Sequence, residues 1–408
     1  MTPRTLHPDS LAVHAGREDL TSLGVHALPL DLSSTNPLPD IETGGLSYEV
    51  LATGGLPLEG GSHVYARLWN PTVARFETAI ARLEHAEEAV AFSSGMAAIT
   101  AVLLSLGESG KRHVVAVRPL YGGTDHLLAS GLTGVEATFC TPDGVAASVR
   151  PDTGLVILES PANPTLELVD IRAVVAAAGD VPVVVDNTFA TPVLQRPLDL
   201  GAAMSLHSAT KYLGGHGDVV GGVAACDART AAALRRTRAI TGAILHPLAA
   251  YLLHRGLATL PLRVRAQQAS AQIIAEWLTT RPEVVAVHYP GPPTGDPHGL
   301  IGTQQDGPGA MISIELAGGF AAASALTSAV ELFTHAVSLG SVDSLIQHPA
   351  ALTHRPVQSE AKPSEALVRL SIGLEATEDL IADLAQALSI AGADSATGAD
   401  QATMSRAY

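Results

Sequence analysis

Residues 204–218, with the sequence MSLHSATKYLGGHGD, join a short apolar run to a turn rich in glycine and small hydroxyl residues. The run Met204–Leu206 is typical of a buried strand, and Lys211 follows it among small side chains. A lysine in this setting is well placed to attack a carbonyl compound as an amine nucleophile. A surface lysine is the commoner case, so the rest of the chain has to decide between the two.

Similar apolar runs recur between about residues 89 and 226 and alternate with stretches of helical periodicity. They are rich in valine and isoleucine and do not alternate with polar residues, which is typical of strands covered on both faces. Such strands, alternating with helices, predict a mostly parallel sheet with right-handed crossovers. The predicted strands are Ala89–Phe92, His113–Val117, Leu155–Leu158, Val181–Val185, Met204–Leu206 and Gly222–Ala225.

Unusual polar groups follow four of these strands, at the edge where open α/β sheets bind ligands. Ser93–Ala98 opens a helix with small residues, so its free N–H groups suit a phosphate. Tyr121 offers a flat ring, and Asp186 is a carboxylate that would be costly to bury unpaired. Taken singly, these features fit a tight turn, a structural tyrosine and a helix cap. Together with Lys211 they form the set that holds pyridoxal phosphate.

Composition excludes several other classes of protein. The 408 residues carry a formal net charge of -16, which argues against a nucleic-acid partner. Only 16% of residues are charged and 47% are hydrophobic, so part of the surface is expected to be buried against other subunits. Two cysteines, Cys140 and Cys226, exclude a disulfide framework or a cysteine-rich zinc site.

Two further alternatives, a membrane span and a metal site, are disfavoured by the sequence. Ala89–Gly107 is uncharged and long enough to imitate a membrane span, but a serine-glycine turn in its middle favours a strand, a turn and a helix, so no membrane partner is expected. His207, His216 and Asp218 could be imagined as metal ligands, but no supporting pattern accompanies them and no metal is expected. The first twenty residues are polar, which predicts a cytoplasmic protein.

The chain divides into four predicted parts. An irregular N-terminal arm, residues 1–62, precedes a large domain, 63–260, in which a helix is expected to begin at Asn70-Pro71. A smaller α+β domain, 261–390, contains a helix near Val264–Leu278, strands near Met311–Leu316 and Leu367–Ile372, and a last helix from about Thr377. Residues 391–408 are expected to form a disordered tail.

Further motifs give the chain a resemblance to the Cys/Met-metabolism family of pyridoxal-phosphate (PLP) enzymes. The resemblance runs from about residue 60 to 390 and is most specific at residues 208–218. It also rests on ESPANP at 159–164, VDNT at 185–188, SLG at 338–340, HPA at 348–350 and RLSIG at 369–373. It implies the type I fold of PLP-dependent transferases, in which the large domain holds the mostly parallel sheet.

The resemblance also implies roles for individual residues. Lys211 would bind PLP as a Schiff base, and Asp186 would keep the ring nitrogen protonated. Tyr121 would stack on the ring and act as the acid for the leaving group, while Asn163 would hydrogen-bond the phenolic oxygen. The implied phosphate ligands are Gly95 and Met96 through their backbone and Ser208 and Thr210 through their hydroxyls.

Other implied contacts concern the substrate and a second subunit. Arg369 would clamp the substrate α-carboxylate through a bidentate pair, with Ser338 close to it. Tyr65 and Arg67 would reach the phosphate in a neighbouring subunit, with the N-terminal arm lying against that neighbour. The resemblance therefore implies a homotetramer built as a dimer of dimers with shared active sites.

The family contains several activities. The first expectation is γ-elimination on a sulfur amino acid, as in methionine γ-lyases, releasing a thiol, 2-oxobutanoate and ammonia. The alternatives are a cystathionine γ-lyase, or γ-replacement on an O-acyl-homoserine by a cystathionine γ-synthase or a homocysteine-forming sulfhydrylase. A protein that keeps the fold and cofactor for binding or regulation is a rival of another class, disfavoured by the intact lysine, aspartate and tyrosine.

Four positions bear on the choice between these activities. Val337 replaces a glutamate that is frequent in cystathionine-handling members, which favours a methionine γ-lyase. Gly123 stands where many methionine γ-lyases have cysteine, and Arg238-Ala239 stands where Lys-Asp is usual, at the border of the γ-group pocket. The segment Gly44–Ser62 is also longer than usual and is expected near the entrance of the site.

Overall fold

The computed structural model describes residues 6–357 and 362–405, which form two compact units. Unit 1 comprises the described residues up to Val117 together with Leu127–Leu158 and Ile171–Pro261. Unit 2 comprises Arg118–His126, Glu159–Asp170 and the described chain from Leu262 on. Unit 2 thus includes two segments that lie within the predicted large domain, at the ends of strands β2 (His113–Val117) and β4 (Thr153–Glu159).

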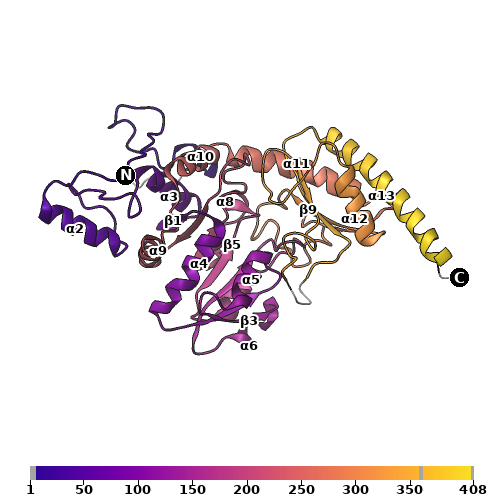
Figure 1. The fold of residues 1–408 in the computed structure, drawn as a ribbon, viewed down its shortest axis with the longest axis horizontal. Coiled ribbons are helices and arrows are strands. Elements are labelled where there is room, and N and C mark those ends of the chain that lie inside the picture. The colour runs from indigo at the N-terminus through magenta and orange to yellow at the C-terminus, as the bar shows by residue number, and fades with distance from the viewer. Residues whose placement is uncertain (1–5, 358–361, 406–408) are drawn as a thin grey trace. The chain divides into compact units, whose positions relative to one another are not determined.

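Unit 1 contains a seven-stranded sheet in the order β1-β7-β6-β5-β4-β2-β3 (Figure 1). The pairs β2–β3, β2–β4 and β5–β6 are parallel, whereas β7 runs antiparallel to both β1 and β6. All six predicted strands are present, and the predicted mostly parallel α/β sheet is confirmed. The strands are β1 Glu88–Phe92, β2 His113–Val117, β3 Glu136–Cys140, β4 Thr153–Glu159, β5 Val183–Asp186, β6 Met204–His207 and β7 Gly222–Cys226.

Burial explains which strands the sequence predicts. Every residue of β2 is buried, and its apolar run is uninterrupted. The strand that sequence patterning missed, β3, lies at the edge of the sheet, where all its residues stay at least partly exposed. Its polar and apolar residues are therefore mixed, without the continuous apolar run of a central strand.

Helix α3 (Pro71–Leu83) of unit 1 begins at the expected cap. Asn70 caps α3 by accepting hydrogen bonds from the N–H groups of Thr72 and Val73, at 3.0 and 3.2 Å. The uncharged run 89–107 divides into β1, a turn and α4 (Gly95–Ser105), and no described helix is long and apolar enough to cross a membrane. The remaining helices are α5 Gly122–Ser130, α6 Val145–Ser148, α7 Ile171–Ala178, α8 Thr191–Leu194, α9 Ala228–Thr241 and α10 Pro247–Leu257.

The N-terminal arm is more ordered than its glycines and prolines suggest. It contains α1 (Pro8–His14) and α2 (Ile41–Ala52), where an irregular segment was predicted. Contacts with the rest of unit 1 stabilise α2: the side chain of Arg235 on α9 donates to the carbonyl of Gly54 at 2.7 Å. Leu51 also packs with Leu68 and with Ala239 of α9 in a small buried cluster.

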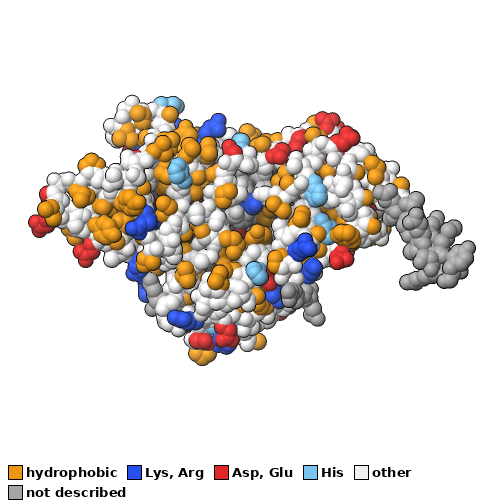
Figure 2. All heavy atoms as spheres, in the orientation of Figure 1, with side chains coloured by type: hydrophobic (Ala, Val, Ile, Leu, Met, Phe, Trp, Pro, Cys, Tyr) orange, Lys and Arg blue, Asp and Glu red, His pale blue; other side chains and the backbone are white. Residues whose placement is uncertain are grey.

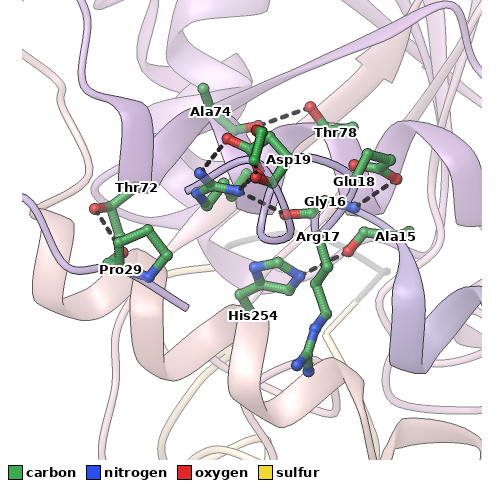
Figure 3. A network of polar contacts seen from close by, with 12 residues as sticks. Ala15, Gly16, Arg17, Glu18, Asp19, Pro29, Thr72, Ala74, Thr78 and His254 are labelled. Atoms are coloured by element: carbon green, nitrogen blue, oxygen red, sulfur yellow. Dashed lines mark hydrogen bonds and ion pairs between the residues drawn. The ribbon is translucent and has the colours of Figure 1, made fainter. Parts of the chain in front are cut away.

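A polar network fixes the end of α1 to α3 and α10 (Figure 3). The buried His254 of α10 donates from Nε2 to the carbonyl of Ala15 at 2.8 Å. Arg75 of α3 donates to the carbonyl of Gly16 at 3.2 Å and pairs with Asp19 at 2.6 Å. Burial lowers the pKa of His254, so the imidazole is neutral and its Nε2–H remains the donor.

Unit 2 contains a five-stranded sheet in the order β10-β11-β12-β9-β8, antiparallel except for the β10–β11 pair. Its strands are β8 Val284–His288, β9 Met311–Leu316, β10 Thr334–His335, β11 Leu345–Gln347 and β12 Leu367–Ser371. Its helices are α11 Leu260–Leu278, α12 Gly319–Ala329 and α13 Thr377–Ser405, the last two packed side by side (Figure 1).

The last helix, α13, continues well past its predicted end. Residues 391–405 are helical, in contrast to the predicted disordered tail, and residues 406–408 lie outside the described residues. The segment is rich in alanine, the strongest helix former. The buried Leu384, Leu388 and Ala391 anchor the preceding turns.

Gly16 provides a test of how the arm is held. It has a φ of +76°, and a Cβ there would lie 2.4 Å from the carbonyl oxygen of Arg75. Gly24 has a similar φ of +66° with nothing within 4 Å, so it is a matched control. We expect Gly24→Ala to cost about 1 kcal/mol and Gly16→Ala clearly more. Denaturant unfolding and protease accessibility of the first thirty residues would measure this, and equal effects of the two substitutions would contradict it.

Candidate active site

The residues expected to form the site divide between the two units, and each unit holds a chemically distinct set. Unit 1 holds the expected cofactor residues Tyr65, Arg67, Gly95, Met96, Asp186, Ser208, Thr210 and Lys211. Unit 2 holds the expected ring-stacking, amide and substrate residues Tyr121, Asn163, Ser338 and Arg369.

The turn between β1 and α4 has the form of an anion site. Ser94 caps α4 by accepting from the N–H of Ala97 at 3.0 Å. Gly95 and Met96 are the first two residues of the helix, so their N–H groups have no acceptor within it. A Cβ at Gly95 would lie 3.0 Å from the side chain of Ser208, which shows how closely this turn approaches the start of the lysine turn.

Gly222 makes this close approach possible. It is the first residue of β7 and pairs with Phe92 at the end of β1. A Cβ at Gly222 would lie 2.2 Å from the carbonyl oxygen of Ser94 and 2.7 Å from the nitrogen of Gly95. Any larger residue would therefore push the backbone of the turn away from β7.

The carboxylate of Asp186 is tied to the lysine turn through Thr188. Oδ1 of Asp186 accepts from the N–H of Thr188 at 3.0 Å and from its hydroxyl at 2.5 Å, while the N–H of Ser208 donates to the Thr188 hydroxyl at 2.8 Å. Desolvation by burial raises the pKa of Asp186, and the hydrogen bonds from Thr188 oppose that rise. Oδ2 accepts no hydrogen bond from the described residues, so it can serve a ligand.

Backbone contacts fix the turn that carries Lys211. The N–H of Lys211 donates to the carbonyl of Ser208 at 3.1 Å, and the N–H of Gly215 donates to the carbonyl of Lys211 at 2.8 Å. The hydroxyl of Thr210, an expected phosphate ligand, accepts from the N–H of Gly221 at 3.0 Å and donates to the carbonyl of Gly221 at 3.2 Å. Thr210 therefore shapes the turn in this structure.

Tyr65 and Arg67 lie together shortly after the end of the arm. The guanidinium of Arg67 is 5.7 Å from the centroid of the Tyr65 ring and also donates to the carbonyl of Ala239 at the end of α9. The ring of Tyr65 is about half-exposed. Both side chains are thus presented at the surface of unit 1.

Arg369 organises the site residues of unit 2. It is buried on β12 and donates to Oδ1 of Asn163 at 2.8 Å and to the carbonyl of Ser338 at 3.0 Å. Ser338 has a φ of +90°, unusual for a residue with a side chain, and this conformation directs its carbonyl toward Arg369. Because Oδ1 of Asn163 accepts from Arg369, the amide of Asn163 keeps Nδ2 as its donor.

Tyr121 is positioned by residues for which no role was predicted. The carboxylate of Glu159 accepts from the backbone N–H of Tyr121 at 2.7 Å. A Cβ at Gly122 would lie 2.1 Å from the carbonyl oxygen of Thr353, so the loop is tightly packed at this point. The ring of Tyr121 is partly exposed. Glu159 lies in a recognised motif, but its contact with Tyr121 crosses 38 residues and leaves no local signal.

Two residues expected at the border of the γ-group pocket serve the packing of unit 1. Arg238 is buried and donates to Glu77 at 2.6 Å and to the carbonyl of Ala91 at 2.7 Å. Ala239 is buried in the small apolar cluster that it forms with Leu51 and Leu68. Arg238 and Ala239, which stand in place of the usual Lys-Asp pair, therefore pack α9 against α3, β1 and the arm.

Comparison with known proteins connects these features to a family. The model of the Cys/Met metabolism PLP-dependent enzymes matches residues 9–389. This chain belongs to that family. An L-methionine gamma-lyase of Brevibacterium aurantiacum is 59% identical over 384 residues, which cover 94% of this chain and 95% of the relative. As a member of the family, the chain is a PLP-dependent enzyme.

Solved structures of the family share the fold. A methionine gamma lyase from Micromonospora echinospora superposes with a TM-score of 0.82 at 39% identity, covering 94% of this chain and 99% of that one. A cystathionine gamma synthase from Xanthomonas oryzae pv. oryzae gives 0.86 at 37% identity, covering 96% and 100%. The predicted type I fold is thereby confirmed, and the fold is common to members with different activities.

Gly222→Ala is expected to weaken cofactor binding, because its Cβ would displace the turn that presents the N–H groups of Gly95 and Met96. We expect at least a tenfold rise in the Kd of the apo-protein for PLP, or about 1.4 kcal/mol. Gly107→Ala is the control, since a Cβ there meets nothing within 4 Å. Fluorescence titration would measure both, and an unchanged Kd for Gly222→Ala would contradict the expected displacement.

His354 gives unit 2 a predictable pH dependence. Burial lowers the pKa of His354 to about 4, and the charge of Arg369 acts in the same direction. The unfolded chain takes up a proton near pH 6.5, so this group destabilises the fold progressively as the pH falls from about 6.5 to about 4. The slope reaches about 1.4 kcal/mol per pH unit.

Urea titrations of the PLP-saturated enzyme across this range would measure that slope. His354→Gln removes the titrating group, so its stability should depend less on pH than that of the unchanged enzyme. Parallel slopes for the two proteins would show that His354 is not held neutral in the fold.

Proposed function

We propose that this chain is a PLP-dependent lyase that eliminates the γ-methylthio group of L-methionine, releasing a thiol, 2-oxobutanoate and ammonia. The observation that carries this proposal is the 59% identity to an L-methionine gamma-lyase over 94% of the chain. The solved cystathionine gamma synthase is 37% identical to this chain, although its TM-score of 0.86 is slightly higher than the 0.82 of the solved methionine gamma lyase. Sequence likeness therefore supports the methionine activity, while the fold alone does not discriminate.

The described residues of unit 1 fit the cofactor. The N–H groups of Gly95 and Met96, beside the Ser208 hydroxyl, offer donors to a phosphate. Oδ2 of Asp186 is available to the protonated nitrogen of a pyridine ring. Lys211 supplies the amine that can bind the carbonyl group of PLP covalently. When bound, PLP supplies an electron sink for carbanion chemistry at the substrate α-carbon.

The protein side chains then have separate tasks. Lys211, with its backbone fixed by Ser208 and Gly215, moves the proton at the α-carbon. Arg369 binds the α-carboxylate, with its guanidinium plane set by Asn163 and Ser338. Tyr121 donates the proton to the departing sulfur. The hydrogen bond that the backbone N–H of Tyr121 donates to Glu159 keeps this tyrosine in place.

We further propose that the enzyme is a homotetramer, a dimer of dimers in which Tyr65 and Arg67 reach the phosphate in a neighbouring subunit. The surface of the arm supports this arrangement. Figure 2 shows hydrophobic side chains over the arm, and Ile41 of α2 is 94% exposed. Other exposed apolar side chains of the arm include Leu32, Leu38, Leu46, Tyr48 and Leu56.

Assays of keto-acid release would test the activity directly. We expect rapid formation of 2-oxobutanoate from methionine, and a loss of at least about 1,000-fold in Lys211→Ala, which lacks the α-carbon base. Arg369→Lys should mainly raise KM, because lysine cannot form the bidentate pair.

The main alternative is γ-replacement on an O-acyl-homoserine, and the same assay distinguishes it. No keto acid from methionine, together with rapid cysteine-dependent formation of cystathionine from O-acetylhomoserine, would overturn the proposal. Rapid keto-acid release from cystathionine and none from methionine would instead indicate a cystathionine γ-lyase.

A further inference from the structure

The short segment of unit 2 that carries Tyr121 is closed by an ion pair. Arg118 directly follows β2, and Asp125 lies in the first turn of α5, so Tyr121 stands between the two partners. Nε of Arg118 donates to Oδ2 of Asp125 at 2.6 Å, and Nη2 donates to Oδ1 at 3.1 Å. The comparisons assign no role to this pair, and none of the tasks proposed above uses it.

The geometry of this pair is more restrictive than that of an ordinary surface ion pair. Both carboxylate oxygens accept from the guanidinium, which fixes the relative orientation of two planar groups. The side chain of Asp125 is only 6% exposed and that of Arg118 is 24% exposed, so solvent and salt screen the pair less than a pair at the surface. Exposed ion pairs contribute at most about 1 kcal/mol to stability. A bidentate pair that is partly buried restrains the segment between its partners more firmly.

The ring of Tyr121 depends on such a restraint. Tyr121 is 38% exposed, whereas Asp125 is 4% exposed. A buried core side chain is held by many neighbours, but a ring this exposed has fewer of them. The place of the Tyr121 hydroxyl is therefore set mainly by the backbone that carries it.

The backbone of Tyr121 is held on both sides. Its N–H donates to the carboxylate of Glu159 at 2.7 Å, and its carbonyl accepts from the N–H of Asp125 at 3.0 Å. At Gly122, a Cβ would lie 2.1 Å from the carbonyl oxygen of Thr353, so the chain has no room to shift in that direction. The ion pair completes this set of contacts by joining the two ends of the segment.

The task proposed for Tyr121 requires a defined position. When the Cγ–S bond of methionine breaks, the sulfur takes the bonding electron pair and the hydroxyl proton of Tyr121, and a neutral thiol leaves. A positioned acid contributes about 10²- to 10⁴-fold to a rate. A displacement of about 1 Å, caused by a change far from the reacting atoms, can cost about 100-fold. Restraint of the Tyr121 backbone therefore bears on the reaction itself.

We propose that Arg118 and Asp125 are positioning residues for the leaving-group step: their ion pair restrains residues 118–125 and keeps the Tyr121 hydroxyl where the departing sulfur takes its proton. This inference rests on the proposed function, in which Tyr121 is the acid. Neither Arg118 nor Asp125 needs to touch the substrate, because both act through the backbone that they restrain.

Asp125→Asn tests the proposal with little change in shape, because it removes the charge and one of the two acceptors. L-methionine and its S-trifluoromethyl analogue are matched substrates that differ only in the hydrogens of the methyl group. Fluorine makes the departing thiolate a far weaker base, so that it can leave without a proton. We expect kcat for methionine to fall about tenfold, a part of the contribution of the acid, and kcat for the analogue to change less than about twofold.

Hydrogen exchange gives a second measurement that does not depend on catalysis. In the PLP-loaded enzyme, we expect the peptide that covers residues 118–126 to exchange faster in Asp125→Asn than in the unchanged protein. The amides of Tyr121 and Asp125 are hydrogen-bonded, and they lose protection when the segment opens more often.

Asp19→Asn is the matched control, since it breaks the bidentate pair of Asp19 with Arg75 in the arm. This control should leave the ratio of the two kcat values and the exchange of residues 118–126 unchanged. In Asp125→Asn, equal losses for both substrates, no loss, or unchanged exchange would each overturn the proposal. An unchanged enzyme that releases no keto acid from methionine would instead refute the proposed function.

Arg118→Lys is the second variant, in case Asp125→Asn does not fold. Lysine keeps the positive charge but cannot form the bidentate pair. We expect a smaller loss that is again confined to methionine, and its absence would overturn the proposal.

Discussion

The hydrogen bonds that join Asp186, Thr188 and Ser208 are the constraint on which the proposed cofactor residues depend. They connect the end of β5 to the end of β6, so they hold the Asp186 carboxylate at a constant distance from the turn that carries Lys211. They also lower the pKa of the Asp186 carboxyl group, against the rise that burial causes. The close contact of Gly222 with Ser94 holds the turn between β1 and α4, the proposed phosphate site, at the same edge of the sheet.

The buried parts of the fold could be predicted because their signals are local. The strand His113–Val117 has the predicted bounds, and α3 begins at the predicted Asn-Pro cap. The edge strand β3 and the helix α2 could not be predicted in this way. Both carry weak local patterns, and α2 is held by distant partners such as Arg235 and Ala239 on α9. Tertiary contacts of this kind override the disorder that glycine and proline suggest.

The site residues show the same division. Lys211 and Asp186 could be proposed from strand ends, because parallel sheets bind ligands there. Thr188, Glu159 and Asp125 received no role, since each acts on a partner that only the folded chain brings near. The hydroxyl of Thr210 bonds the backbone of Gly221, which the sequence pattern did not indicate, and its contact with a phosphate stays a prediction.

The central claim is that Lys211 is the residue that binds the cofactor covalently. The chain has three lysines, Lys111, Lys211 and Lys362, so only three possible attachment sites have to be distinguished. Borohydride reduction of the PLP-loaded enzyme, followed by peptide mass spectrometry, would locate the trapped adduct. We predict a pyridoxyl-phosphate adduct on the peptide containing Lys211 and on no other. An adduct on Lys111 or Lys362, or none at all, would contradict this account of the site.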